Sequence, residues 1–131
     1  MFMEQRTRRS RPKSDKAREQ RIAMEIIADC NDEAEQMMGW YNYLEEQLRF
    51  SFTAHCIAKR EISPLRVNTE VDVIGMVSEN ECRHEIFVRM RWERDGLGVP
   101  LSQLKASAYA DKQTIQAVED WHYWVKRGYQ F

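Results

Sequence analysis

Carboxylate side chains gather in three short stretches of this sequence, and oxygen donors at this density can hold a hard cation. Calcium takes six to eight oxygen ligands in a tolerant geometry, and loops containing Asp, Glu and Asn supply them. A cation site is therefore one use of these stretches, and a solvated acidic surface is the other. The stretches contain Asp29, Asp32, Glu33 and Glu35, then Glu70 and Asp72, then Glu79, Glu81 and Glu85.

The first stretch is not an EF-hand loop, although it begins with Asp29 and continues with Asn31. An EF-hand loop needs a glycine near its middle and a bidentate Glu at its twelfth position. Counting from Asp29, no glycine is in register and the twelfth residue is Trp40. A calcium site here must therefore use a different arrangement of oxygen ligands.

A transition-metal site is an alternative, because Cys82 and His84 stand two positions apart and Cys56 could join them. Thiolate and imidazole ligands suit zinc. The three cysteines, however, lie about 26 residues apart without the close pairing of a zinc ribbon. We expect them to be reduced thiols, and cysteine is often buried as a small apolar residue.

Signatures of catalysis are missing from the sequence. There is no phosphate-binding glycine loop, no nucleophile elbow and no HExxH motif. His55 stands beside Cys56, but neighbouring residues on a strand point to opposite faces and do not form a catalytic dyad. His84 and His122 have no nucleophile beside them. We expect that the protein is not an enzyme.

Charge is distributed unevenly around a formal total of −1. Residues 1–21 hold eight basic and three acidic side chains, whereas the rest of the chain holds 12 basic and 18 acidic ones. We therefore expect residues 1–20 to form a basic arm and residues 21–131 to form one acidic domain. A basic arm can contact nucleic acid, but this one has no aromatic side chain after Phe2 to stack on a base. A solvated tail is the simpler interpretation.

No run of apolar residues is long enough to span a bilayer or to act as a signal peptide. We therefore expect a cytoplasmic protein without membrane contacts. The length of 131 residues and the hydrophobic content of 43 % suit a single folded domain.

Helical periodicity at both ends predicts the elements that position the acidic stretches. One helix is expected from Ser14 to about Ile27, with a strand at 22–27 as the alternative, and the Asp29–Asp32 stretch should end it. Asn31 or Asp32 can cap the next helix, whose interior Gly39 implies close packing. A third helix should run from about residue 110 to Gly128. Its expected buried stripe is Ile115, Val118, Trp121 and Val125, and that of the second helix is Met37, Trp40, Tyr41, Leu44 and Leu48.

Between these helices the periodicity changes to two, which is typical of half-buried strands. Four short strands are expected, at 50–58, around 71–75, at 86–92, and after the turn at Asp95 and Gly96. The pattern predicts an α+β fold with N-terminal helices, a small antiparallel SH3-like β barrel or curved sheet, and a C-terminal helix. An SH3-like barrel is a common adaptor fold, so a protein-interaction module is an alternative function.

Whole phrases of the sequence, in order from about Arg21 to Phe131, carry a family resemblance. These phrases include GWYNYLE, NTEVDVIGM, ECRHEIFVRMRWE, LGVPLSQL and EDWHYW. They resemble the small bacterial non-EF-hand calcium-binding family typified by the cyanobacterial calcium-binding protein.

The resemblance implies a protein that binds Ca²⁺ through surface carboxylates, acting as a buffer or sensor. Combined with the carboxylate stretches, it gives two candidate sites. The first would use Asp29, Asp32 and Glu33, and the second Glu79, Glu81 and Glu85. Calcium ions are the expected ligand, with a protein partner and nucleic acid as the alternatives.

Overall fold

The longest elements are two 15-residue helices, and each begins at an aspartate cap. The computed structural model describes residues 15–127, in which α2 spans Glu33–Gln47 and α3 spans Lys112–Lys126. The Asp32 carboxylate accepts a hydrogen bond from the Glu35 amide, and the Asp111 carboxylate accepts one from the Gln113 amide. These bonds satisfy amides that the helix itself leaves unpaired.

The apolar stripe expected on α2 is confirmed, since Met37, Trp40, Tyr41, Leu44 and Leu48 are all buried. Trp40 is fully buried at the centre of an aromatic cluster. Its ring centroid lies 5.2 Å from that of Trp121 and 5.6 Å from that of Trp124, both on α3. Edge-to-face and tilted contacts of this kind add to the stabilisation that burial provides. The cluster holds α2 and α3 together.

The first helical segment consists of α1, Lys16–Arg21, followed by a π-helical turn, η2, Ile22–Ile26. Asp15 caps α1, whereas the expected cap Ser14 lies outside the described residues. A Cβ on Gly39 would collide with the carbonyl oxygen of Ile26. Gly39 is therefore required where η2 crosses α2, which confirms the close packing expected from the sequence.

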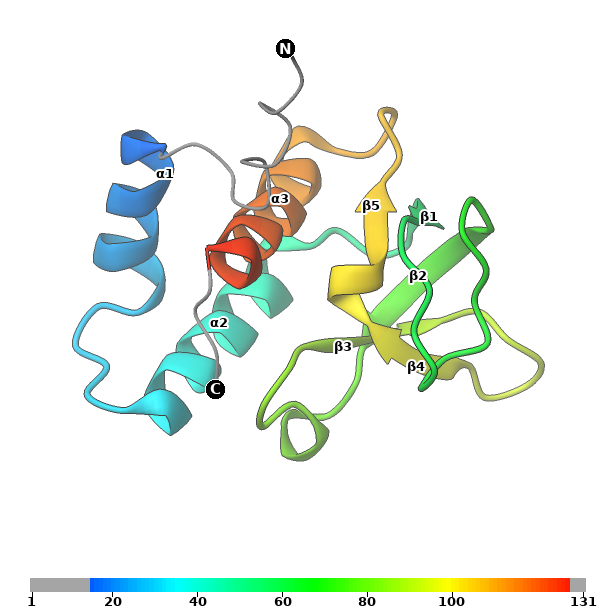
Figure 1. Cartoon of the computed structure of the whole chain (residues 1–131), viewed down its shortest axis with the longest axis horizontal. Helices are drawn as coiled ribbons and strands as arrows, with labels where there is room; N and C mark the ends of the chain where they lie inside the picture. The colour runs from blue at the N-terminus through cyan, green and yellow to red at the C-terminus, as the bar shows by residue number, and fades with distance from the viewer. Residues whose placement is uncertain (1–14, 128–131) are drawn as a thin grey trace, which may run out of the picture.

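The strands form one open antiparallel sheet in the order β4-β3-β2-β1-β5, which confirms the antiparallel sheet predicted between the helices. Short 3-10 turns, η3 and η4, precede β3 and β5. Figure 1 shows the sheet on one side of the three helices, with α3 between α2 and β5. The bounds are Phe52–Cys56 for β1, Glu70–Met76 for β2, Glu79–Glu81 for η3, Phe87–Met90 for β3, Leu97–Pro100 for β4, Leu101–Gln103 for η4 and Leu104–Ala106 for β5.

Three details of the sheet and of α3 differ from the sequence prediction. The three-residue strand β5 was not predicted, because it is too short to show a period. Trp92 and Val125 were expected in buried stripes but are 42 % and 37 % exposed. β3 ends at Met90, before Trp92, and α3 turns Trp124 rather than Val125 into the core.

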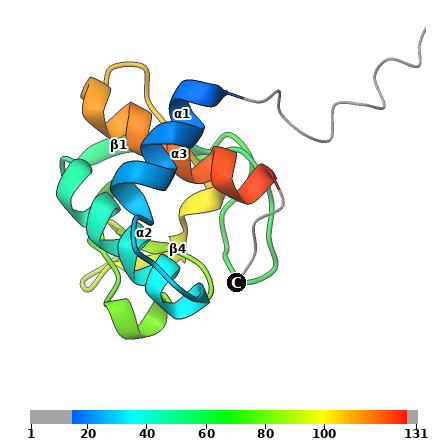
Figure 2. The ribbon, with the colours of Figure 1, turned by 90° about the vertical axis from the view of Figure 1, so that its left-hand side faces the viewer.

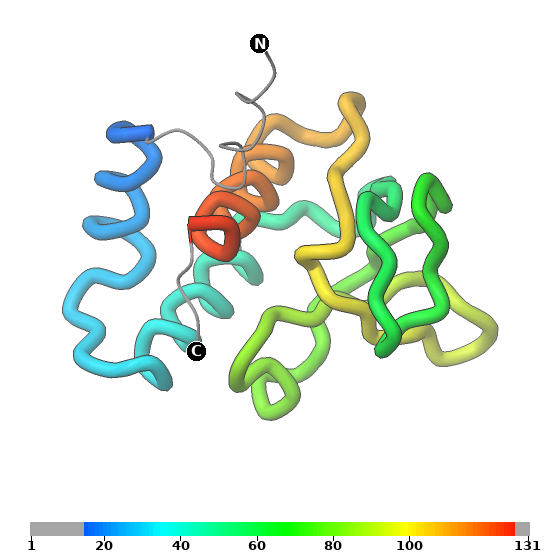
Figure 3. The backbone as a smooth tube through the Cα atoms, in the orientation of Figure 1, coloured from blue at the N-terminus to red at the C-terminus, as the bar shows by residue number. Residues whose placement is uncertain are grey.

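The loops 57–69 and 91–96 both lie at the end of the sheet that is remote from α1, as the backbone trace in Figure 3 shows. At the opposite side, Figure 2 shows α1 lying against α3. No residue of α1 itself is buried, so apolar contacts do not hold this helix in place.

Polar contacts attach α1 to α3 instead, and their centre is the fully buried carboxylate of Asp120. Arg18 Nε and Arg21 Nη2 each donate to it at 2.7 Å, and the Tyr43 hydroxyl donates at 2.8 Å. The hydrogen bond to Asp120 raises the pKa of Arg21. Burial, followed by the hydrogen bond to Asp120, raises the pKa of Tyr43 to about 12. Arg18 and Arg21 therefore have a structural role, although both belong to the basic segment identified in the sequence.

Candidate metal centre

At the N-terminal end of α2, some carboxylates accept hydrogen bonds from the backbone and one does not. Asp32 caps the helix, and Glu35 Oε1 accepts a hydrogen bond from the Asn31 amide at 2.6 Å. Both carboxylates therefore hold the loop in shape. Glu33, the first residue of α2, is exposed, and within residues 15–127 its side chain makes no hydrogen bond or ion pair. Glu33 is therefore free to bind a ligand.

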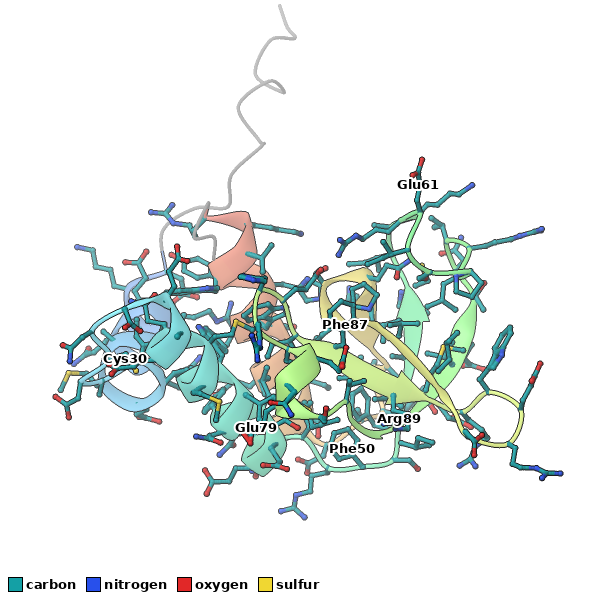
Figure 4. The ribbon with its side chains drawn as sticks, turned by 90° about the horizontal axis from the view of Figure 1, so that it is seen from below. Cys30, Phe50, Glu61, Glu79, Phe87 and Arg89 are labelled. Atoms are coloured by element: carbon teal, nitrogen blue, oxygen red, sulfur yellow. The ribbon has the colours of Figure 1, made fainter. Side chains whose placement is uncertain are left out.

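The loop between β2 and β3 is held against α2 by a hydrogen bond. The Tyr41 hydroxyl, on α2, donates to the carbonyl oxygen of Val77 at 2.7 Å. The buried Cys82 sulfur accepts from the Phe87 amide at 3.4 Å and fixes the other end of the loop. The turn η3, which carries Glu79, therefore lies beside α2, as the view in Figure 4 shows.

These two segments line one pocket of about 440 Å³. Glu33 reaches it from α2, and Glu79 and Asn80 reach it from η3. Two carboxylates and one amide are oxygen donors of the type that calcium prefers, so the donor chemistry fits this ion. Two carboxylates and one amide oxygen supply at most five ligands, so backbone carbonyls or water would complete the coordination of any calcium bound there. The complete lining is Glu33, Ala34, Met37, Met38, Glu79, Asn80, Cys82, Arg83 and His84.

The electrostatic surroundings of this end of the molecule favour a cation. Residues 22–48 contain seven acidic side chains and no Lys, Arg or His. Burial, followed by the negative charges of Glu81 and Glu85, raises the pKa of the Cys82 thiol. Burial, followed by Glu35, Asp29 and Asp32, raises that of Cys30. The positive end of the α2 dipole opposes a cation, so the carboxylates must outweigh it.

The remaining predicted ligands lie elsewhere. Asp29, which adopts a left-handed turn with φ of 63°, lines a second pocket with Asn31, Glu35 and Asn42. Glu81 is exposed and lines neither pocket. Glu85 pairs with Arg60 and accepts a hydrogen bond from Ser102 at 3.3 Å. In the described part of the chain, no three His, Cys, Asp or Glu side chains are grouped closely enough to hold a metal ion.

The zinc and histidine alternatives gain no support from the described residues. Cys56, Cys82 and His84 do not form a metal-binding group in residues 15–127, and both cysteines are buried. Burial lowers the pKa of His122, whose Nε2 lies 2.6 Å from the carbonyl oxygen of Leu104. His122 therefore links α3 to β5 and has a structural explanation.

Comparison with known protein families supports calcium as the ligand of this protein. The model of the CcbP family, described as calcium binding, matches residues 20–125. The chain belongs to this CcbP calcium-binding family. The match confirms the resemblance seen in the sequence.

Two solved structures of similar proteins agree with this assignment. The crystal structure of CcbP from Anabaena has a TM-score of 0.80 and 36 % sequence identity, and the match covers 92 % of this chain and 98 % of that one. A calcium-binding protein in its calcium-binding form has a TM-score of 0.78 and 36 % identity, with 89 % and 95 % covered. A search of curated proteins found no match. The predicted α+β fold is therefore that of the CcbP family.

Two residues of the pocket were not predicted from the sequence as parts of a site. Asn80 is a neutral oxygen donor between two glutamates, and the known use of amide oxygens by calcium is the signal that could have identified it. Arg83 lines the same pocket, but its positive charge repels a cation, so it is not a ligand.

No helix within residues 15–127 is long and apolar enough to cross a membrane.

Proposed function

We propose that this member of the CcbP family binds calcium reversibly between the first turn of α2 and the turn η3. Glu33, Glu79 and Asn80 would supply oxygen ligands, and backbone carbonyls or water would complete the coordination shell. The observation that carries the proposal is the shared pocket, because it joins one glutamate from each of the two sequence-predicted sites. Membership in a calcium-binding family supports the choice of ion.

The other predicted residues would act mainly through their charge. Asp29, Asp32 and Glu81 lie in the same two segments and add to the negative potential without lining this pocket. Glu85 is neutralised by Arg60, so it would contribute least. Few charged ligands on a solvent-exposed surface favour weak binding, because the ligand charge count strongly affects calcium affinity. Such a site suits a buffer or sensor that must release the ion.

The family also indicates binding rather than catalysis, in line with the expectation that the protein is not an enzyme. A cytoplasmic location remains our proposal. We also keep residues 1–20 and 21–131 as proposed arm and domain, with residues 16–20 already inside α1.

Calorimetric titration of the double variant E33Q/E79Q with calcium tests the site. The loss of two carboxylates should weaken calcium binding at least about tenfold. E61Q/E70Q is the matched control, because it removes the same charge from exposed positions outside the pocket. Figure 4 shows Glu61 far from Glu79. If both double variants bind calcium as the parent protein does, the site lies elsewhere.

A further inference from the structure

The loop between β2 and β3 contains an arginine that shares a pocket with glutamates. Arg83 lines the same pocket as Glu33 and Glu79. Two residues further along the loop, Glu85 is neutralised by its ion pair with Arg60. One carboxylate of the loop, Glu85, is therefore paired with an arginine. Another, Glu79, shares a pocket with Arg83 but forms no ion pair with it.

The Arg83 guanidinium forms no hydrogen bond or ion pair within residues 15–127. This distinguishes it from the arginines that are committed to carboxylates, namely Arg18, Arg21, Arg60, Arg91 and Arg127. Its side chain is exposed, so a rigid neighbour does not hold it in one position. Arg83 therefore lines the acidic pocket without pairing with Glu33 or Glu79.

A permanent positive charge beside a cation site must weaken binding, because it repels the incoming ion and attracts the same carboxylates. Arg stays protonated at any physiological pH, so the effect is constant rather than switched by pH. The repulsion acts between solvent-exposed groups, so it is moderate and is screened by salt.

We propose that Arg83 sets the affinity of the calcium site. Its positive charge competes with the ion for the carboxylates and so keeps calcium binding weak and readily reversible. This inference rests on the proposed function, because it places calcium in the pocket of Glu33 and Glu79. It adds a role for a residue that provides no ligand.

The experiment compares calcium affinity in three single variants by calorimetry at low and at high ionic strength. R83Q should bind calcium about two- to fivefold more tightly at low salt, and the gain should shrink at high salt. R83K keeps the charge and should bind as the parent protein does. R94Q is the matched control, because it removes an exposed arginine from loop 91–96, beyond the other end of β3. Thermal melting in the presence of a chelator checks that all three remain folded.

The E33Q/E79Q variant separates the two ways in which the inference can fail. If E33Q/E79Q weakens binding while R83Q and R94Q behave alike, the site is correct and Arg83 does not set its affinity. If neither E33Q/E79Q nor R83Q changes the affinity, calcium binds elsewhere and the inference fails together with the site. A gain in calcium affinity that is present in R83Q and absent from both R83K and R94Q supports the proposal.

Discussion

Two junctions of this molecule contain carboxylates, and they use them in opposite ways. At the junction of α1 and α3, Asp120 is fully buried and surrounded by Arg18, Arg21 and Tyr43. At the junction of α2 and η3, Glu33 and Glu79 are exposed and have no such partners in the described residues. A carboxylate whose oxygens are occupied by guanidinium groups stabilises the fold. One that has no such partner remains available to a cation.

The difference also shows why net charge alone is a poor guide to a cation site. Loop 78–85 contains three glutamates, but Arg60 neutralises Glu85. On β2, Asp72 faces Arg91 across a gap of 3.5 Å. Segment 22–48 contains seven acidic residues and segment 67–82 contains four, with no basic residue in either. The position of each arginine decides which acidic residues are available.

The largest expected effect comes from breaking the buried junction with D120N. This change leaves Arg18 and Arg21 facing a neutral amide, so the free energy of unfolding should fall by about 3 kcal/mol. We take the lower end of the range for buried pairs, because the two arginine side chains remain 23 % and 22 % exposed. Urea unfolding measures the loss. Calcium affinity of the folded protein should not change, and a change would mean that the two junctions are coupled.

At the acidic junction, replacing the helix cap Asp32 should distinguish its effect on stability from the effect of its charge on calcium binding. D32A removes the cap of α2 and should cost about 1 kcal/mol of unfolding free energy. D32S removes the same charge but keeps a capping oxygen, so its stability should stay close to that of the parent protein. Both should weaken calcium binding less than E33Q/E79Q. If D32S weakens it as much, Asp32 is a ligand as well as a cap.

The pH dependence of stability should report the buried junction through Tyr43. The folded-state pKa of Tyr43 is raised from 10.0 to about 12. A raised pKa means that the folded protein holds this proton longer, so the associated stability is present below pH 10 and is lost as the pH rises towards 12. Unfolding measured across this window should show a steeper loss for the parent protein than for Y43F. Equal slopes would contradict the role of the Tyr43 hydroxyl.

The smallest effect concerns the thiol of Cys30 beside the acidic loop. Cys30 is partly exposed while Cys56 and Cys82 are buried, so alkylation at pH 8 should modify Cys30 first. After burial, the charges of Glu35, Asp29 and Asp32 raise its pKa. D29N should lower that pKa and speed alkylation, and Asn tolerates the left-handed turn at this position. C30S identifies the reacting thiol, and an unchanged rate in D29N would mean that the charge of Asp29 does not raise the pKa of Cys30.

Local patterns in the sequence were sufficient for much of the fold. The buried stripe of α2 and the close approach at Gly39 follow from spacing and residue type, and the structure confirms both. The sequence left the cap of α2 open between Asn31 and Asp32, and the structure shows that it is Asp32. Predictions failed where an element is very short, as in β5, or where a stripe extends past the end of its element, as at Trp92. Periodicity needs several residues of regular structure before it carries information.

The sequence by itself determined the types and local grouping of the acidic residues, the helices and strands that carry them, and the family to which they belong. Only the tertiary structure decided that Glu33 and Glu79, 46 positions apart in the chain, share a pocket, and that Asp120 and Glu85 are committed to arginines. The physical reason is that helix and strand propensities act over a few residues. A cation site, in contrast, depends on which charges the packing of distant segments leaves unpaired.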